Sequence, residues 1–158
     1  MEQVINHNET ADREIVITRL LNAPRELVFK AWTDPKHLIK WWGCKDFTNT
    51  FHEIDIRPGG VWRFTMHAPN GMDFLNVVTY KEIIAPEKLV YEHGSGEEND
   101  EAKFNVVITF EDQDGKTRIT MRSLFVSSAI HDMLIREFGA IEGGNQTLDR
   151  LEQELLTM

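Results

Sequence analysis

The chain has little of three things: cysteine, basic residues and long apolar runs. Its single cysteine, Cys44, cannot form a disulfide within the chain, which favours a reducing compartment. The formal net charge is −9 and no Lys/Arg cluster is present, which argues against nucleic acid and anionic membranes as partners. No stretch approaches the ~20 apolar residues that span a bilayer, and residues 1–12 form a polar leader without a secretion signal. These absences predict a cytoplasmic protein that neither binds nucleic acid nor inserts into membranes.

Catalytic and metal-binding motifs are also scarce. The histidines that fall in predicted elements lie on different ones, namely His37, His52, His67, His93 and His131. Neither a His-x-Glu-x-x-His pattern nor a cysteine pair marks a metal site, and no glycine loop opens a helix to bind phosphate. The acidic stretch over residues 94–101 is interpreted as a solvated loop rather than a calcium site. We therefore expect no metal, no cofactor and no catalytic residue, and hence no enzyme.

Seven stretches are rich in β-branched and aromatic residues and predict strands. They cover residues 13–21, 50–56, 60–67, 72–84, 88–93, 104–111 and 116–125. Short turns with Pro, Gly, Asn or Asp separate nearly all of the last six, and such turns join antiparallel neighbours. The pattern predicts an antiparallel meander that follows an isolated first strand.

Three helices are predicted, two short and one long. Pro24 suits the first turn of a helix that ends near Asp34, and a second helix covers residues 36–42. The third, over residues 129–156, carries an apolar stripe of Leu134, Phe138, Ile141, Leu148, Leu151 and Leu155. Gly143 and Gly144 interrupt this stripe and leave two interpretations open: a hinge between two helices, or one helix with free space beneath it.

Together these elements predict an α+β fold in a single domain over residues 13–158. A curved antiparallel sheet of six to seven strands would carry two short helices and the long C-terminal helix, which is the only cover for one face of the sheet. Where a bent sheet and a helix diverge, side chains cannot fill the wedge between them. We therefore expect a ligand cavity between sheet and helix.

Strand alternation indicates which side chains face this cavity. Over residues 72–84 two faces compete, and the face of Val78 is favoured over the face of Val77. The candidate ligand-binding residues are Trp41, Trp42, Trp62, Phe64, Met66, Phe74, Val78, Tyr80, Tyr91, His93, Phe104, Val106, Met121, Phe138, Ile141 and Gly144.

Two groups of these candidates stand out, one by its position on a helix and the other by its polar atoms. Adjacent helical residues point ~100° apart, so Trp41 and Trp42 are interpreted either as a pocket rim or as core residues. The polar tips of His93, Tyr91 and Tyr80 could orient a ligand carbonyl or hydroxyl, or serve acid–base chemistry.

Several ordered motifs resemble one known family. They are APRELVFKAWTDP at 23–35, WWG at 41–43, DIRPGGVWRF at 55–64, PEKLVY at 86–91 and TLDRL at 147–151. They are similar to the START-like proteins of the SRPBCC superfamily, in the branch related to the C-terminal domain of the activator of the ninety-kilodalton heat-shock-protein ATPase. This resemblance implies the helix-grip fold. Many relatives carry a bulky residue near Gly144, so a glycine at this position is expected to enlarge the pocket.

The resemblance also implies a set of functions. Members of the superfamily bind lipids, sterols, flavonoid-like aromatics or polyketides in the cavity, and a few cyclise or hydrolyse them. The leading hypothesis is therefore binding of a small hydrophobic ligand. The first alternative is a module that contacts a chaperone and stimulates its ATPase in a stress response. The second is a cyclase or hydrolase that uses His93, Tyr80 and Tyr91.

Overall fold

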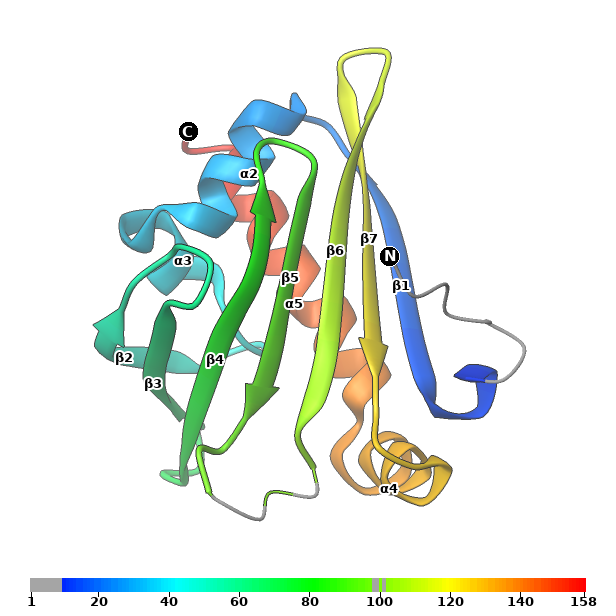
Figure 1. Cartoon of the computed structure of the whole chain (residues 1–158). Coiled ribbons are helices and arrows are strands. Elements are labelled where there is room, and N and C mark those ends of the chain that lie inside the picture. Colours follow the sequence, from blue (N-terminus) through cyan, green and yellow to red (C-terminus); the bar gives the residue numbers. More distant parts are fainter. Residues whose placement is uncertain (1–9, 98–99, 101) are drawn as a thin grey trace.

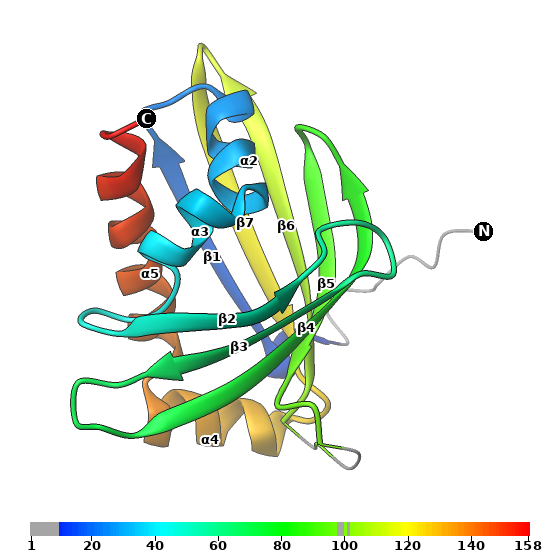
Figure 2. The ribbon, with the colours of Figure 1, turned by 90° about the vertical axis from the view of Figure 1, so that its left-hand side faces the viewer.

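The computed structural model describes residues 10–97, 100 and 102–158. Within them, seven strands form one antiparallel sheet that curves around the helices (Figures 1 and 2). The strands are β1 (Glu14–Leu21), β2 (Thr48–Ile54), β3 (Val61–His67), β4 (Asp73–Ile84), β5 (Lys88–Gly94), β6 (Phe104–Gln113) and β7 (Lys116–Leu124). The helices are the 3-10 helix η1 (Ala11–Arg13), α2 (Arg25–Thr33), α3 (Pro35–Trp41), α4 (Ser128–Phe138) and α5 (Ala140–Leu155). The predicted α+β fold is confirmed.

The strand order β1-β7-β6-β5-β4-β3-β2 follows the chain except at β1. Strands β2 to β7 pair with their neighbours in sequence, whereas β1 pairs with β7 because α2 and α3 carry the chain to the opposite edge of the sheet. Figure 2 shows β2 and β3 turned strongly away from the direction of β1 and β7. The sheet therefore wraps around the side that carries α2, α3 and α5. No described helix is both long and apolar enough to cross a membrane.

Proline and aspartate set the starts of the two short helices. Pro24 is the extended N-cap of α2, and Pro35 is the first residue of α3. The Asp34 carboxylate accepts a hydrogen bond from the backbone N–H of Lys36 (3.0 Å), which satisfies one of the free donors at the start of α3. Of the predicted polar leader, residues 1–9 lie outside the described part of the chain, and η1 occupies its end.

The C-terminal helical segment is divided at a glycine that the sequence analysis passed over. Gly139 adopts the left-handed conformation (φ 59°, ψ 43°) between α4 and α5, where a side chain would be strained. One unbroken helix over residues 129–156 is therefore wrong, and so is a hinge at Gly143 and Gly144, because both lie inside α5. A Cβ atom at Gly144 would collide with the Ile17 side chain of β1, and one at Gly143 would lie 3.1 Å from Cys44 Sγ.

The core is solid where α2, α3 and the second half of α5 meet the sheet. Trp41 is 1% exposed, and its indole N–H donates to the Ala31 carbonyl (3.0 Å). Its ring packs edge-on against Trp32, with ring centroids 4.8 Å apart. Leu148 and Leu151 of α5 are fully buried in the same cluster. Of the two interpretations of the tryptophan pair, the core position applies to Trp41.

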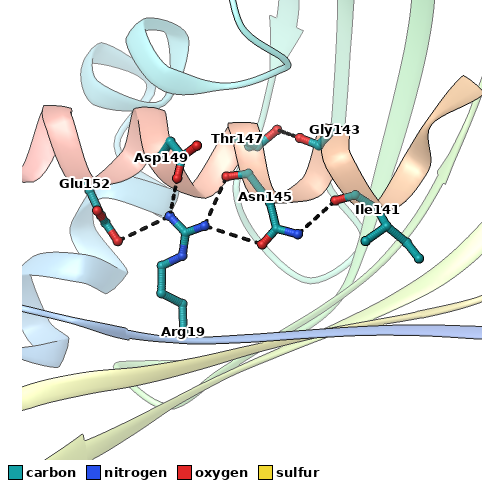
Figure 3. A network of polar contacts seen from close by, with 7 residues as sticks. All are labelled: Arg19, Ile141, Gly143, Asn145, Thr147, Asp149 and Glu152. Atoms are coloured by element: carbon teal, nitrogen blue, oxygen red, sulfur yellow. Dashed lines mark hydrogen bonds and ion pairs between the residues drawn. The ribbon is translucent and has the colours of Figure 1, made fainter.

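Two arginines tie α5 to its neighbours. From β1, Arg19 donates to the carboxylates of Asp149 (2.7 Å) and Glu152 (3.2 Å) and to the backbone carbonyl of Asn145 (3.3 Å), as Figure 3 shows. From α5 itself, Arg150 reaches the chain that leaves α3. It donates to the backbone carbonyls of Lys40 (3.1 Å), Trp42 (2.9 Å), Gly43 (3.3 Å) and Cys44 (3.0 Å). The helix is thus fixed to the sheet on one side and to α3 on the other.

We predict that Arg150→Met lowers the free energy of unfolding by about 2–3 kcal/mol, because it removes a charged donor from several carbonyls at once. Arg136→Met is the matched control, since Arg136 lies exposed on α4 and its loss should change stability by less than about 0.5 kcal/mol. Equilibrium unfolding in urea measures both. Equal losses in the two variants would contradict the role given to Arg150.

Candidate ligand-binding cavity

A cavity of about 270 Å³ lies between the sheet and the junction of α4 with α5. Its floor comes from β3, β5, β6 and β7, one wall from the segment after α3, and its cover from the end of α4 and the start of α5. The cavity therefore lies beyond the point where Gly144 brings α5 close to β1. A cavity at the divergence of sheet and helix is where the sequence analysis expected one.

The wall is aromatic and carries no formal charge. Among the described residues that line it, none is Asp, Glu, Lys or Arg. The His93 ring lies 5.0 Å from that of Phe104 and 6.2 Å from that of Trp42. Cavities of ~150 Å³ hold benzene, whereas drug-sized ligands occupy about 300–1,000 Å³. The volume thus suits a flat molecule of one or two rings.

Nine of the sixteen candidate residues line this cavity. They are Trp42, Met66, Tyr91, His93, Phe104, Val106, Met121, Phe138 and Gly144. Trp42 faces the cavity while its neighbour Trp41 faces the core, because Trp42 has left the helix and is extended (φ −65°, ψ 134°). Gly144 lies at the edge of the cavity, but the space beneath its Cα is occupied by Ile17, so its lack of a side chain serves close packing.

The other seven candidates lie elsewhere. Five are buried in the core and do not line the cavity, namely Trp41, Trp62, Phe64, Val78 and Tyr80. Phe74 shares a strand face with Val78 but is 40% exposed, and its nearest ring neighbour is Phe47 (6.4 Å between centroids). Ile141 is 40% exposed in the first turn of α5; it shares the helix face of Leu148, but this end of the helix is not covered as Leu148 is.

Seven lining residues were missed by the sequence analysis: Gly43, Cys44, Ser123, Gly139, Ala140, Gly143 and Thr147. Ser123 shares the inward face of β7 with Met121, so alternation contained a signal for it. Gly139 could have been found as a helix break. No local pattern marks Cys44 or Thr147, because their place depends on how α3 and α5 pack together.

His93 is the best-defined polar group of the wall. Its Nε2 atom lies 2.9 Å from Oδ1 of Asn76, on the adjacent strand β4. Burial lowers the pKa of His93 to about 4, and the carboxylate of Asp100 opposes this only weakly. The imidazole is therefore neutral at neutral pH.

The two other titratable side chains of the cavity wall, Tyr91 and Cys44, are neutral as well. Burial raises the pKa of Tyr91 and of Tyr80, and the two rings lie 6.2 Å apart. Burial also raises the pKa of Cys44, although the Arg150 guanidinium partly offsets this. These protonation states make the wall a set of neutral hydrogen-bonding groups, without a thiolate or a phenolate.

No metal site is visible in the described part of the chain, where no three His, Cys, Asp or Glu side chains are grouped to hold an ion. The acidic loop over residues 94–101 lies partly outside the described residues. In its described part the Asp100 carboxylate accepts hydrogen bonds from the backbone N–H groups of Ser95 (2.6 Å) and Ala102 (3.0 Å). That carboxylate is thus engaged in holding the loop.

The burial of neutral His93 predicts a pH effect on stability. Unfolded, the imidazole takes up a proton near pH 6.5; folded, it does so only near pH 4. Between these values the unfolded state binds more protons, so stability falls as pH falls through this window. By pH ~4.5 wild type should lose roughly 2 kcal/mol more than His93→Gln does, relative to pH ~7. Urea unfolding across this range measures it, with exposed His52→Gln as control; parallel curves for His93→Gln and wild type would contradict the prediction.

Several solved protein structures are similar to this chain over most of its length. A solved protein of Nitrosomonas europaea is similar at 25% identity with a TM-score of 0.83, covering 93% of this chain and 96% of that one. A protein of Arthrobacter aurescens is similar at 23% identity with a TM-score of 0.84, covering 94% and 89%. A protein of Mycobacterium smegmatis is similar at 23% identity with a TM-score of 0.81, covering 91% of each chain. No curated protein matches the sequence.

A family model described as "Activator of Hsp90 ATPase homolog 1-like protein" matches residues 22–155, nearly the whole chain. The matched region includes every strand except β1, both short helices, and α4 and α5. The chain therefore belongs to the family of proteins like the activator of Hsp90 ATPase homolog 1, and it has the START-like helix-grip fold.

Proposed function

We propose that this protein binds a small, uncharged, largely apolar molecule in the cavity between the sheet and the junction of α4 with α5. The observation that carries the proposal is an uncharged, aromatic-rich cavity of about 270 Å³ beside a closely packed core. Small-molecule sites are concave and mostly apolar with a few polar groups, and this cavity has that character. Its volume favours an aromatic ligand of one or two rings over a long-chain lipid or a sterol.

The way into the cavity runs past the junction of α4 with α5. Phe138 lines the cavity and is 67% exposed, and none of the residues of α4 is fully buried. The helix is held at its start by the Ser127 hydroxyl, which accepts from the Ile130 N–H (3.2 Å), and by His131 Nε2 at 3.0 Å from the Glu14 carbonyl. Weakly buried elements open at low free-energy cost. α4 is therefore the part of the cover that moves aside for a ligand.

A cavity-filling substitution tests the proposal. Ser123→Phe places a ring in the cavity from the inward face of β7. Wild type should bind naphthalene or a similar bicyclic probe with micromolar affinity, about −8 kcal/mol, and Ser123→Phe should weaken binding at least about tenfold. Trp42 lies in the wall, so its fluorescence reports occupancy, and a bound probe should slow the labelling of Cys44 by a maleimide.

Val126→Phe is the matched control, because Val126 is 63% exposed just after β7 and lies outside the cavity wall. It should bind the probe as wild type does. If the thermal transition shows that Ser123→Phe does not fold, Ser123→Leu takes its place. Failure of every bicyclic probe to bind wild type would overturn the proposal. Stimulation of a heat-shock ATPase by this chain, unaffected by Ser123→Phe, would then assign its function to its surface.

A further inference from the structure

Several polar groups on cavity-lining residues form no hydrogen bond within the described residues. Among them are the hydroxyls of Ser123 and Tyr91 and the indole N–H of Trp42, which can all donate, and the Nδ1 atom of His93. Thr147 also lines the cavity, but its hydroxyl already donates to the Gly143 carbonyl (2.9 Å). A hydroxyl can rotate and either donate or accept, so Ser123 and Tyr91 adapt to a ligand. His93 can select ligands that donate a hydrogen bond only if its tautomer is fixed.

A chain of two hydrogen bonds fixes that tautomer. The Asn76 side-chain Nδ2 donates to the backbone carbonyl of Phe74 (3.0 Å), which can only accept. The amide oxygen of Asn76 must then face His93, and it lies 2.9 Å from Nε2. An amide oxygen only accepts, so Nε2 carries the ring proton. Nδ1 is consequently the unprotonated nitrogen.

Nδ1 of His93 has no partner and is not one of the fully buried atoms left without one, and His93 belongs to the cavity wall. We therefore take this nitrogen to border the cavity. The ring is neutral at neutral pH, so Nδ1 keeps its lone pair. If a bound ligand offers no donor, this acceptor loses its hydrogen bond to water and gains none in return, so such a ligand binds more weakly.

The wall also sorts ligands by charge. No Lys or Arg is among the described residues that line the cavity, and Arg150 nearby is engaged by four backbone carbonyls. A carboxylate in this cavity would find no positive charge in the wall to pair with, only neutral hydrogen-bonding groups, aromatic rings and the His93 lone pair. Burying a charge without a countercharge is costly, so a neutral ligand is favoured over an anion.

We infer that the cavity selects a neutral aromatic molecule with an O–H donor, a phenol in the simplest case, whose hydroxyl donates to Nδ1 of His93. The inference rests on the proposed function and adds the chemical class of the ligand. The Asn76 amide acts as a positioning residue, because it orients the imidazole and sets its tautomer without reaching the cavity wall itself.

The tautomer can be tested without any ligand. Ring ¹⁵N NMR of the full chain should show His93 with a protonated Nε2 and an unprotonated Nδ1. Asn76→Ala should shift this toward a mixture of tautomers, while His52→Gln, on the exposed face of β2, should leave the His93 signals in place. A dominant Nδ1-protonated form in wild type would overturn the inference and leave the proposed cavity function standing.

Ligand selection is tested with four matched probes: 2-naphthol, 2-methoxynaphthalene, naphthalene and 2-naphthoate. Wild type should bind 2-naphthol about tenfold more tightly than its methyl ether, the expected effect of one buried hydrogen bond, and should reject 2-naphthoate. His93→Phe keeps the ring but removes the acceptor, so the preference should fall to about twofold or less. His52→Phe, a matched change on the exposed face of β2, should keep the wild-type preference.

Each outcome separates the two claims. If naphthalene and the methyl ether bind as tightly as 2-naphthol, the cavity function stands and the selection of a donor is wrong. If 2-naphthoate binds most tightly, the preference for a neutral ligand is wrong. If His93→Phe keeps the tenfold preference, another group receives the hydroxyl and the role of His93 is wrong. If no probe binds, the proposed function fails, and the inference fails with it.

Discussion

The structure depends on how closely α5 is held against β1. At Gly144 the helix comes so near that Ile17 fills the space a side chain would take, and Arg19 of β1 holds the next turns through Asn145 and two acidic residues. Arg150 holds the opposite side of the same helix to the end of α3. A rigid helix that is fixed along one part of a curved sheet must diverge from that sheet elsewhere. The cavity is this divergence, bounded by the last close contact.

The glycines near the start of α5 thus have two different structural roles. Gly139 supplies a backbone conformation that ends α4 and lets it turn across the mouth of the cavity, whereas Gly143 and Gly144 supply proximity within a continuous helix. A helix-interior glycine costs about 1 kcal/mol relative to alanine, and close packing against β1 offsets that cost. Strong attachment at one end and a weakly buried α4 at the other give a cavity that is well formed but can be entered.

The strand faces and the turns could be predicted from the sequence because they depend on residues close together in the chain. Alternation in β3, β6 and β7 identified Met66, Val106 and Met121, and turn residues located the meander. What failed was decided by packing between distant segments. Three glycines lie within six residues of each other, and nothing local tells which one breaks the helix and which ones approach a strand. Cys44 entered the wall only because Arg150 draws the loop after α3 toward α5. Phe74 has the right face but lies too near the strand end to be covered.

The polar character of the cavity is likewise set from outside it. Val78 and His93 are paired across β4 and β5, which places Asn76 diagonally opposite His93 on the same face. Asn76 in turn is oriented by a carbonyl of its own strand. The direction of the hydrogen bond offered to a ligand therefore follows from strand register and from a backbone acceptor that cannot change its role. Such an arrangement keeps its preference when the cover moves, because α4 contributes nothing to it. The size of the cavity then depends on how α5 fits on the sheet, whereas the type of hydrogen bond offered to a ligand depends on the sheet alone. Separate substitutions can therefore change these two properties independently.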